Sequence, residues 1–209
     1  MTDTAHQVPA IRRIANPVPV GVAGFALTTF TLGLYTSGRF FAGGEVLVFA
    51  FAAFYGGLVQ LIAGFFSIQR GDTFPATFMT TYGAFWFSFA GLNLYVVPQL
   101  KPAEVGQTVT IFLIMWTVIT VIFFISAFWT NWVVVFAFFE FSVTIILLDI
   151  ATANTNTGLT HFCGYLEMLL GAVAWYIVLA EVINGAAEKE VLPLPKTPWH
   201  PPTGNTSID

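Results

Sequence analysis

Residues 109–150 read VTIFLIMWTVITVIFFISAFWTNWVVVFAFFEFSVTIILLDI, a nearly continuous apolar run with one break, at Trp129-Thr130-Asn131-Trp132. One α-helix of this length would extend for about 60 Å, twice the ~30 Å thickness of the hydrocarbon core of a bilayer. The run therefore predicts two membrane-spanning helices joined by a tight turn at residues 129–132. Tryptophan suits such a turn, because its ring favours the membrane interface.

Four more apolar runs flank this pair, and each is long enough to form one spanning helix. They cover residues 20–37, 46–66, 76–97 and 161–182, with Gly, Pro or polar residues between them. The expected fold is all-α, a polytopic membrane protein with six transmembrane helices. Its expected parts are a cytoplasmic N-terminal segment (1–15), a six-helix transmembrane domain (16–184) and a proline-rich, disordered cytoplasmic tail (185–209).

The composition indicates a bilayer rather than water as the solvent. Hydrophobic residues make up 56% of the chain and charged residues 9%, against roughly 25% charged residues in soluble domains. Seven Lys/Arg and eleven Asp/Glu are too few to cover a soluble core. No second, soluble domain is expected, and no basic stretch suggests binding to nucleic acid. The single cysteine, Cys163, excludes an intramolecular disulfide.

The positive charges predict the orientation, because cytoplasmic loops are enriched in Lys and Arg. With six spans, one side of the membrane holds five of these residues and the other side holds two. The first group is Arg12, Arg13, Arg70, Lys189 and Lys196, and the second is Arg39 and Lys101. We therefore expect a multi-pass protein of the plasma or inner membrane with both termini in the cytoplasm.

Small residues that recur three, four or seven positions apart lie on one face of a helix, where they let another helix approach closely. They are Ala53, Gly57, Gly64, Gly164 and Gly171.

The inventory of reactive groups argues against an enzyme. The sequence has no HExxH, CxxC or GxSxG pattern, and no histidine pair within a span could hold haem or a metal. No lysine lies within a predicted span, which also excludes a retinal Schiff base. We expect no cofactor and no metal site, which leaves a conduit, a receptor or a structural membrane protein.

Four acids lie in or near the last two predicted helices, and no Lys or Arg lies within a span to pair with them. Asp149 and Glu181 can lie near helix ends. Glu140 and Glu167 lie deeper, where a charged carboxylate is costly and the group is held neutral. They are candidates for a proton site in a water-lined path, and the alternative is a pair of hydrogen-bonded structural acids.

An anion conduit without cations in its spans would depend on helix N-termini and neutral donors. Asn16-Pro17-Val18-Pro19 is typical of a helix start, with Asn16 as a cap and proline where an amide donor is dispensable. Further hydroxyl and amide donors in the spans are Gln60, Thr80, Thr81, Tyr82 and Asn93. These residues permit a small channel or transporter and do not specify its substrate.

Seven motifs in order resemble one known family over residues 15–185, the acetate uptake transporters, which include the bacterial succinate-acetate permeases (YaaH-like proteins) and fungal acetate transporters. The motifs begin at Asn16 (NPVPVG), Phe54 (FYGGxxQxxAG), Gly71 (GxTF), Tyr82 (YGxFW), His161 (HFxGY), Gly171 (GAxAxY) and Glu181 (ExxN).

The resemblance implies a ring of six protomers, each with six helices, both termini inside, and its own narrow pore for acetate, other small monocarboxylates and, in some members, succinate. It places an apolar constriction at Phe25, Tyr82 and Phe141, where Phe141 replaces the usual leucine. Ala174 matches a small residue that helps set the pore width. Gln60 and Asn16 are the expected contacts to the carboxylate on either side of the constriction.

Two other functions remain open on the sequence. One is a proton or cation channel lined by the intramembrane acids, and the other is a membrane scaffold or receptor without flux. Within the transport hypothesis, channel-like and proton-coupled mechanisms are also both open.

Overall fold

The computed structural model describes residues 14–199, and within that range the chain is helical and forms no strand. Residues 1–13 and 200–209 lie outside this range, and with them most of the predicted N-terminal segment and the end of the tail. The elements are α1 (Val18–Thr36), η1 (Ala42–Glu45), α2 (Val46–Ala53), η2 (Phe54–Val59), α3 (Gln60–Arg70), α4 (Thr73–Gly91), η3 (Leu92–Val96), η4 (Val97–Gln99), α5 (Pro102–Ala127), α6 (Trp132–Ala153) and α7 (Thr157–Ala187).

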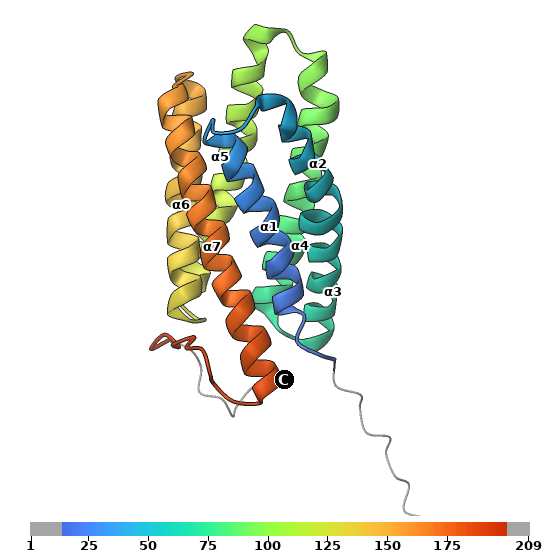
Figure 1. Cartoon of the computed structure of the whole chain (residues 1–209), viewed down its shortest axis with the longest axis vertical. Coiled ribbons are helices and arrows are strands. Elements are labelled where there is room, and N and C mark those ends of the chain that lie inside the picture. Colours follow the sequence, from blue (N-terminus) through green and yellow to red (C-terminus); the bar gives the residue numbers. More distant parts are fainter. Residues whose placement is uncertain (1–13, 200–209) are drawn as a thin grey trace, which may run out of the picture.

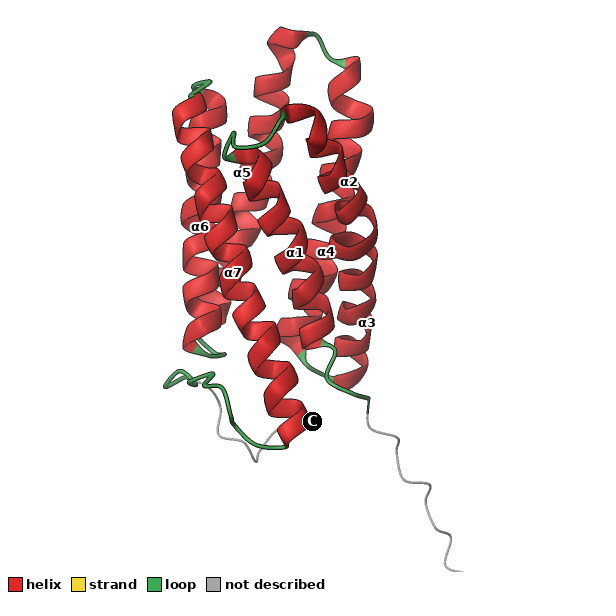
Figure 2. Ribbon diagram, in the orientation of Figure 1, coloured by secondary structure: helices red, strands yellow, loops and turns green. Residues whose placement is uncertain are grey.

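The helices form one elongated bundle (Figures 1 and 2). In chain order its six rods are α1, α2 with η2 and α3, α4 with η3, α5, α6 and α7. The second rod is continuous through α2, the π-helix η2 and α3. The first rod begins and the sixth rod ends at the same end of the bundle (Figure 1). We call this the termini end.

Five of the rods are long and apolar enough to cross a membrane, and α4 is the exception. Residues with hydroxyl groups, such as Thr77, Thr80 and Tyr82, lower the mean hydropathy of α4. Its buried residues include Met79, Tyr82, Gly83 and Trp86. On α5, by contrast, large apolar side chains are exposed at Ile111, Met115, Val118, Ile122 and Ile125. Such an exterior suits a hydrocarbon solvent.

The turn predicted at residues 129–132 is confirmed, since α5 ends at Ala127 and α6 begins at Trp132. Asn131 caps α6, because its side-chain oxygen accepts a hydrogen bond from the Val134 amide at 3.0 Å. Two helices, α5 and α7, start four or more residues earlier than the apolar runs predict. Pro102 starts α5, with the Glu104 carboxylate accepting from the Lys101 amide at 3.0 Å, and Asn156 caps α7 by accepting from the Leu159 amide at 3.0 Å.

The first helix, α1, starts at Val18, two residues before the apolar run that predicts it. Asn16 accepts a hydrogen bond from the Val18 amide at 3.1 Å, although the residue at the cap position is Pro17. The Asn16 side chain therefore satisfies one of the amides that a helix start leaves free.

Close packing of α1 and α7 depends on glycine. A Cβ atom on Gly33 would lie 2.6 Å from the Gly164 carbonyl oxygen, and one on Gly171 would lie 2.7 Å from the Phe30 Cβ atom. A Cβ atom on Gly164 would overlap the Ser37 backbone nitrogen and lie 2.7 Å from the Ser37 Cα atom. The predicted contact role of Gly164 and Gly171 is confirmed.

The tail does not leave the bundle after α7. We call residues 188–199 the strap. Its first half is held by Asn184, whose side-chain oxygen accepts from the Val191 and Leu192 amides at 2.7 and 2.9 Å. The Asn184 amide group donates to the Leu192 carbonyl oxygen at 2.8 Å, and the Tyr176 hydroxyl donates to the Pro193 carbonyl oxygen at 2.8 Å.

The second half of the strap reaches the turn between α5 and α6. Lys196 forms an isolated antiparallel bridge with Asn131, and the Trp132 amide donates to the Pro195 carbonyl oxygen at 2.9 Å. The Trp199 ring lies 5.7 Å from the Phe128 ring, centroid to centroid. Residues 188–199 thus differ from the disorder expected for 185–209. The segment has no core of its own, and its order comes from hydrogen bonds that other elements supply.

Candidate pore and vestibule

Three aromatic rings from three helices meet inside the bundle. They are Phe25 of α1, Tyr82 of α4 and Phe141 of α6. The Phe25 ring centroid lies 5.9 Å from that of Tyr82 and 5.7 Å from that of Phe141, and the Tyr82 and Phe141 centroids are 5.3 Å apart. Separations of 4.5–7 Å are those of rings in contact. We call these residues the aromatic triad. A solute could pass between them only after a ring moves.

Tyr82 is the best-fixed ring of the triad. Its side chain is fully buried, and its hydroxyl lies 2.7 Å from the Thr120 hydroxyl of α5. Thr120 donates its own proton to the Trp116 carbonyl oxygen at 2.8 Å, so Tyr82 is the donor in the first bond. The phenol group therefore points toward α5.

More aromatic rings surround the triad, and the sequence analysis did not single them out. Phe78 lies 5.4 Å from Tyr82 and 5.3 Å from Phe138, and Phe123 lies 5.6 Å from Phe138. Their only signal in the sequence is the total of 23 Phe residues. These rings limit the directions in which the triad can move.

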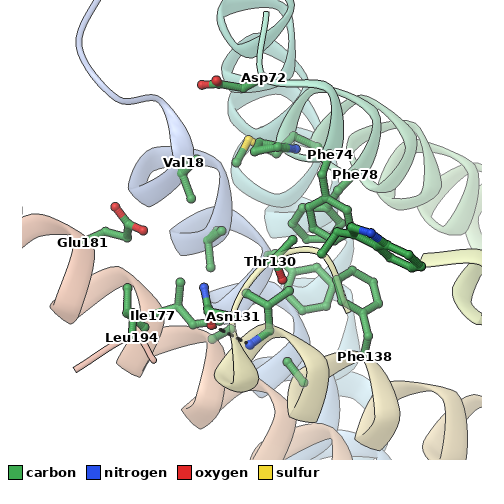
Figure 3. Close-up of a pocket in the computed structure, with 18 of the residues that line it drawn as sticks. Val18, Asp72, Phe74, Phe78, Thr130, Asn131, Phe138, Ile177, Glu181 and Leu194 are labelled. Atoms are coloured by element: carbon green, nitrogen blue, oxygen red, sulfur yellow. Dashed lines mark hydrogen bonds between the residues drawn. The ribbon is translucent and has the colours of Figure 1, made fainter. Parts of the chain in front are cut away.

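A cavity of about 560 Å³ extends from the triad to the termini end. We call it the vestibule; Figure 3 shows residues that line it. Phe25 and Phe141 form part of its lining, together with the apolar residues Met79, Leu170, Ala174 and Ile177. The polar and charged residues of its lining are Asp72, Thr73, Thr130, Asn131, Glu181 and Lys196.

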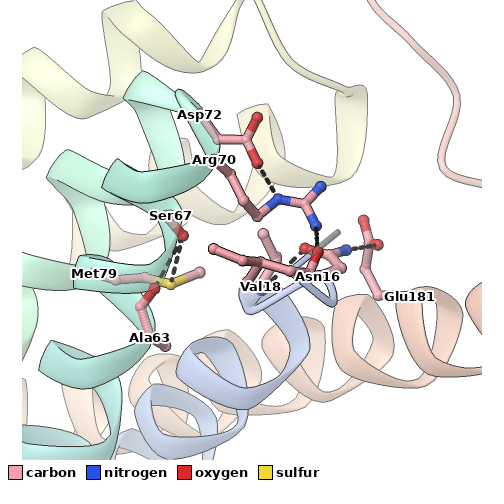
Figure 4. A network of polar contacts seen from close by, with 9 residues as sticks. Asn16, Val18, Ala63, Ser67, Arg70, Asp72, Met79 and Glu181 are labelled. Carbon is pink, nitrogen blue, oxygen red and sulfur yellow. Dashed lines mark hydrogen bonds and ion pairs between the residues drawn. The ribbon is translucent and has the colours of Figure 1, made fainter. Parts of the chain in front are cut away.

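The mouth of the vestibule holds a network of polar contacts (Figure 4). The Asn16 amide group donates to a Glu181 carboxylate oxygen at 2.9 Å. Arg70 forms an ion pair with Asp72 at 2.8 Å and donates to the Ile14 carbonyl oxygen at 3.0 Å. The network joins the start of α1 to α7, and the end of α3 to the start of α4.

Residues 2–199 match the GPR1/FUN34/yaaH family. The chain belongs to the GPR1/FUN34/yaaH family. Its resemblance to acetate uptake transporters is thereby confirmed, and the family match covers all six rods.

Individual relatives agree with the family match. The chain is 35% identical to the succinate-acetate/proton symporter SatP of Escherichia coli (strain K12), over 87% of this chain and 96% of SatP. It is 29% identical to acetate permease A of Emericella nidulans, over 91% of this chain and 69% of that protein. A solved structure of the bacterial acetate channel SatP superposes with a TM-score of 0.81 at 34% identity, covering 87% of this chain and 99% of that one.

In this GPR1/FUN34/yaaH protein the predicted substrate contacts do not form one cluster. Ala174 lines the vestibule, and Asn16 lies at the mouth, bonded to Glu181. The Thr80 hydroxyl donates to the Ala76 carbonyl oxygen at 2.8 Å, and its methyl group faces Gly64 of α3. Thr81 lines a separate cavity of about 480 Å³ beside α5.

Gln60, an expected substrate contact, lines neither the vestibule nor the second cavity. It is fully buried, and neither its amide nitrogen nor its carbonyl oxygen has a hydrogen-bond partner among the described residues. The indole nitrogen of Trp86, 1% exposed, also has none there. Each buried polar group without a partner costs roughly 1–3 kcal/mol. Such groups call for a functional explanation.

The two deep acids, Glu140 of α6 and Glu167 of α7, are buried within the bundle. Glu140 and Glu167 are each 6% exposed, and neither lines the vestibule or the second cavity. One Glu140 oxygen accepts from the Thr144 hydroxyl at 2.8 Å. The other Glu140 oxygen and one Glu167 oxygen have no partner among residues 14–199. Asp149, nearer the end of α6, accepts from the Thr117 hydroxyl at 2.8 Å.

Proposed function

We propose that this chain is a membrane channel or transporter for acetate and other small monocarboxylates. The observation that carries the proposal is the vestibule, a largely apolar cavity lined by Phe25 and Phe141, two of the three touching rings of the aromatic triad. The names of SatP and acetate permease A support it. An apolar throat favours small solutes with little hydration to lose, because each polar group that enters it without a partner is costly.

The constriction in this proposal is the aromatic triad. Ala174 sets the width of the vestibule, while Gln60 and Asn16 bind the carboxylate on opposite sides of the triad. The unpartnered amide of Gln60 supports its part. Thr80 and Thr81 have weaker support, because one is bonded to its own helix and the other lines the second cavity.

The termini end faces the cytoplasm of a plasma or inner membrane in this proposal, and six copies assemble into a ring with one pore each. The distribution of Lys and Arg supports the orientation. Exposed apolar residues of α7, such as Leu179 and Val182, suit lipid or a second copy. Protease access to the tail and the mass of the detergent-solubilised complex test these two parts.

Labelled acetate uptake by purified full-length protein in liposomes tests the transport function. We expect uptake of the label well above that of empty liposomes, and we expect an excess of unlabelled acetate to compete with it and lower it. Potassium flux without acetate uptake would instead indicate a cation channel, and no flux of either kind would indicate a scaffold or receptor. Glu140 and Glu167, the acids that a cation channel would need along its path, do not line the vestibule.

Glu140→Gln is expected to leave the pH dependence of acetate uptake unchanged. Glutamine keeps a side-chain oxygen for the Thr144 hydroxyl, so the hydrogen bond survives while the titrating group is lost. Uptake in liposomes measured between about pH 5 and 8, where most protein switches titrate, checks this. Glu167→Gln is the companion variant. A displaced pH profile in either one would make that acid a proton site.

A further inference from the structure

The strap forms part of the vestibule wall. Leu194 and Lys196 line the cavity together with Ile177 and Glu181 of α7 and with Asn131 at the start of α6. Figure 3 shows Leu194 beside Ile177, with Glu181 and Asn131 close by. A solute that enters the vestibule from the termini end therefore encounters residues of the tail.

Three charged residues line the vestibule, and two of them are acids with partners. Asp72 is paired with Arg70 at 2.8 Å, and Glu181 accepts from Asn16 at 2.9 Å. The third is Lys196, the one cation of this lining. Among residues 14–199 the only ion pair within 4.0 Å is that of Arg70 and Asp72, so the Lys196 ammonium group has no carboxylate at that distance.

The backbone of Lys196 is fixed, although the side chain is long. The bridge to Asn131 holds Lys196 itself, and the Trp132 amide holds the preceding residue through the Pro195 carbonyl oxygen at 2.9 Å. On the other side, Thr197 is 4% exposed and its hydroxyl donates to the Phe128 carbonyl oxygen. The charge is therefore anchored at the mouth, while its flexible stem lets the ammonium group follow a solute.

The vestibule walls strengthen the effect of this charge. A low-dielectric wall screens a charge less than water does, so the charge acts more strongly on a solute in the cleft. Arg70 offsets the charge of Asp72, and Lys196 then stands against the single acid Glu181 in the lining. Asn16, the contact expected at the mouth, already donates its amide group to Glu181. Lys196 is thus the described residue of the lining best suited to attract a carboxylate from solution.

We infer that Lys196 on the strap recruits carboxylate anions into the vestibule and so makes the C-terminal tail a selectivity element of the transport path. This inference rests on the proposed function. It assigns to the strap a role in substrate capture, in addition to its contacts with α5, α6 and α7.

Charge variants in liposomes test the inference. Uptake of labelled acetate is measured at low acetate concentration, with protein oriented so that the termini end faces the label, as shown by protease access to the tail. At low ionic strength we expect Lys196→Glu to lower the initial rate about five-fold, through a higher half-saturation concentration and with the maximal rate nearly unchanged. At 1 M salt the difference should largely disappear, because the Debye length falls to about 3 Å. Lys196→Arg should retain the wild-type rate.

Lys189→Glu is the matched control, because it makes the same change of charge on the same strap outside the vestibule lining. We expect wild-type uptake from this variant. Equal losses in Lys189→Glu and Lys196→Glu would overturn the inference, as would an unaffected Lys196→Glu or a loss that salt does not reduce. If the wild-type protein transports no acetate, the proposed function fails as well, and that result is distinct from the other outcomes.

Discussion

Valine at position 164 is expected to prevent formation of a stable bundle. The Gly164 Cα atom faces the end of α1 so closely that a Cβ atom would overlap the Ser37 nitrogen and lie 2.7 Å from the Thr36 carbonyl carbon. These neighbours are backbone atoms and cannot rotate away, so α1 and α7 would have to separate. Overpacking typically costs 1–3 kcal/mol and sometimes more, and we expect about 3 kcal/mol or more here. Size-exclusion chromatography and thermal unfolding in detergent measure the loss.

Gly185→Val is the control for this variant, since it places the same side chain on the same helix. A Cβ atom on Gly185 meets no atom within 4 Å. Its thermal unfolding should stay close to that of the wild-type protein, because valine is slightly better than glycine in a helix. If Gly164→Val gave the same elution profile and unfolding temperature as Gly185→Val, the close contact of α1 with α7 would be contradicted.

The fold could be predicted from sequence because its main signals are local. The apolar run at 109–150 and its break at 129–132 are enough to predict α5, α6 and the turn between them. The predicted starts of α5 and α7 lie too late in the sequence, because a hydropathy pattern does not detect a first helical turn made of polar residues. Pro102 and Asn156 mark these starts by local backbone chemistry, and both could have been recognised as such.

The strap could not be predicted, because its order depends on partners far away in the sequence. Proline-rich segments without apolar periodicity are typical of disorder. Asn184 and Tyr176 bind the strap only because α7 presents both side chains to it. The sequence therefore indicated only that Lys196 contributes to the orientation of the protein in the membrane, and it did not indicate that this residue lines the vestibule.

The candidate site is an intermediate case. Motif resemblance was enough to propose Phe25, Tyr82 and Phe141 as a constriction, and in the structure their rings touch. Nothing local in the sequence could show that the Tyr82 hydroxyl bonds to Thr120. Nor could it show that Thr80 faces α3, since the direction of a helical side chain depends on which helices pack around it.

Phe141→Leu is expected to raise the uptake of succinate relative to that of acetate by about ten-fold. Phe141 lines the vestibule and contacts both other rings of the triad, at 5.7 Å from Phe25 and 5.3 Å from Tyr82. Leucine is smaller and has no flat ring, so the opening widens when the triad moves. A size difference of one methylene group in an apolar pocket already changes discrimination by 10-fold or more.

The measurement is the ratio of initial uptake rates of labelled succinate and labelled acetate in liposomes. The ratio is compared rather than either rate alone, because it does not depend on how much protein is inserted. Phe136→Leu makes the same substitution on α6 at a side chain that is 47% exposed and does not line the vestibule. We expect this control to keep the wild-type ratio. An unchanged ratio in Phe141→Leu would show that this ring does not limit substrate size, and the constriction would then have to lie elsewhere along the path.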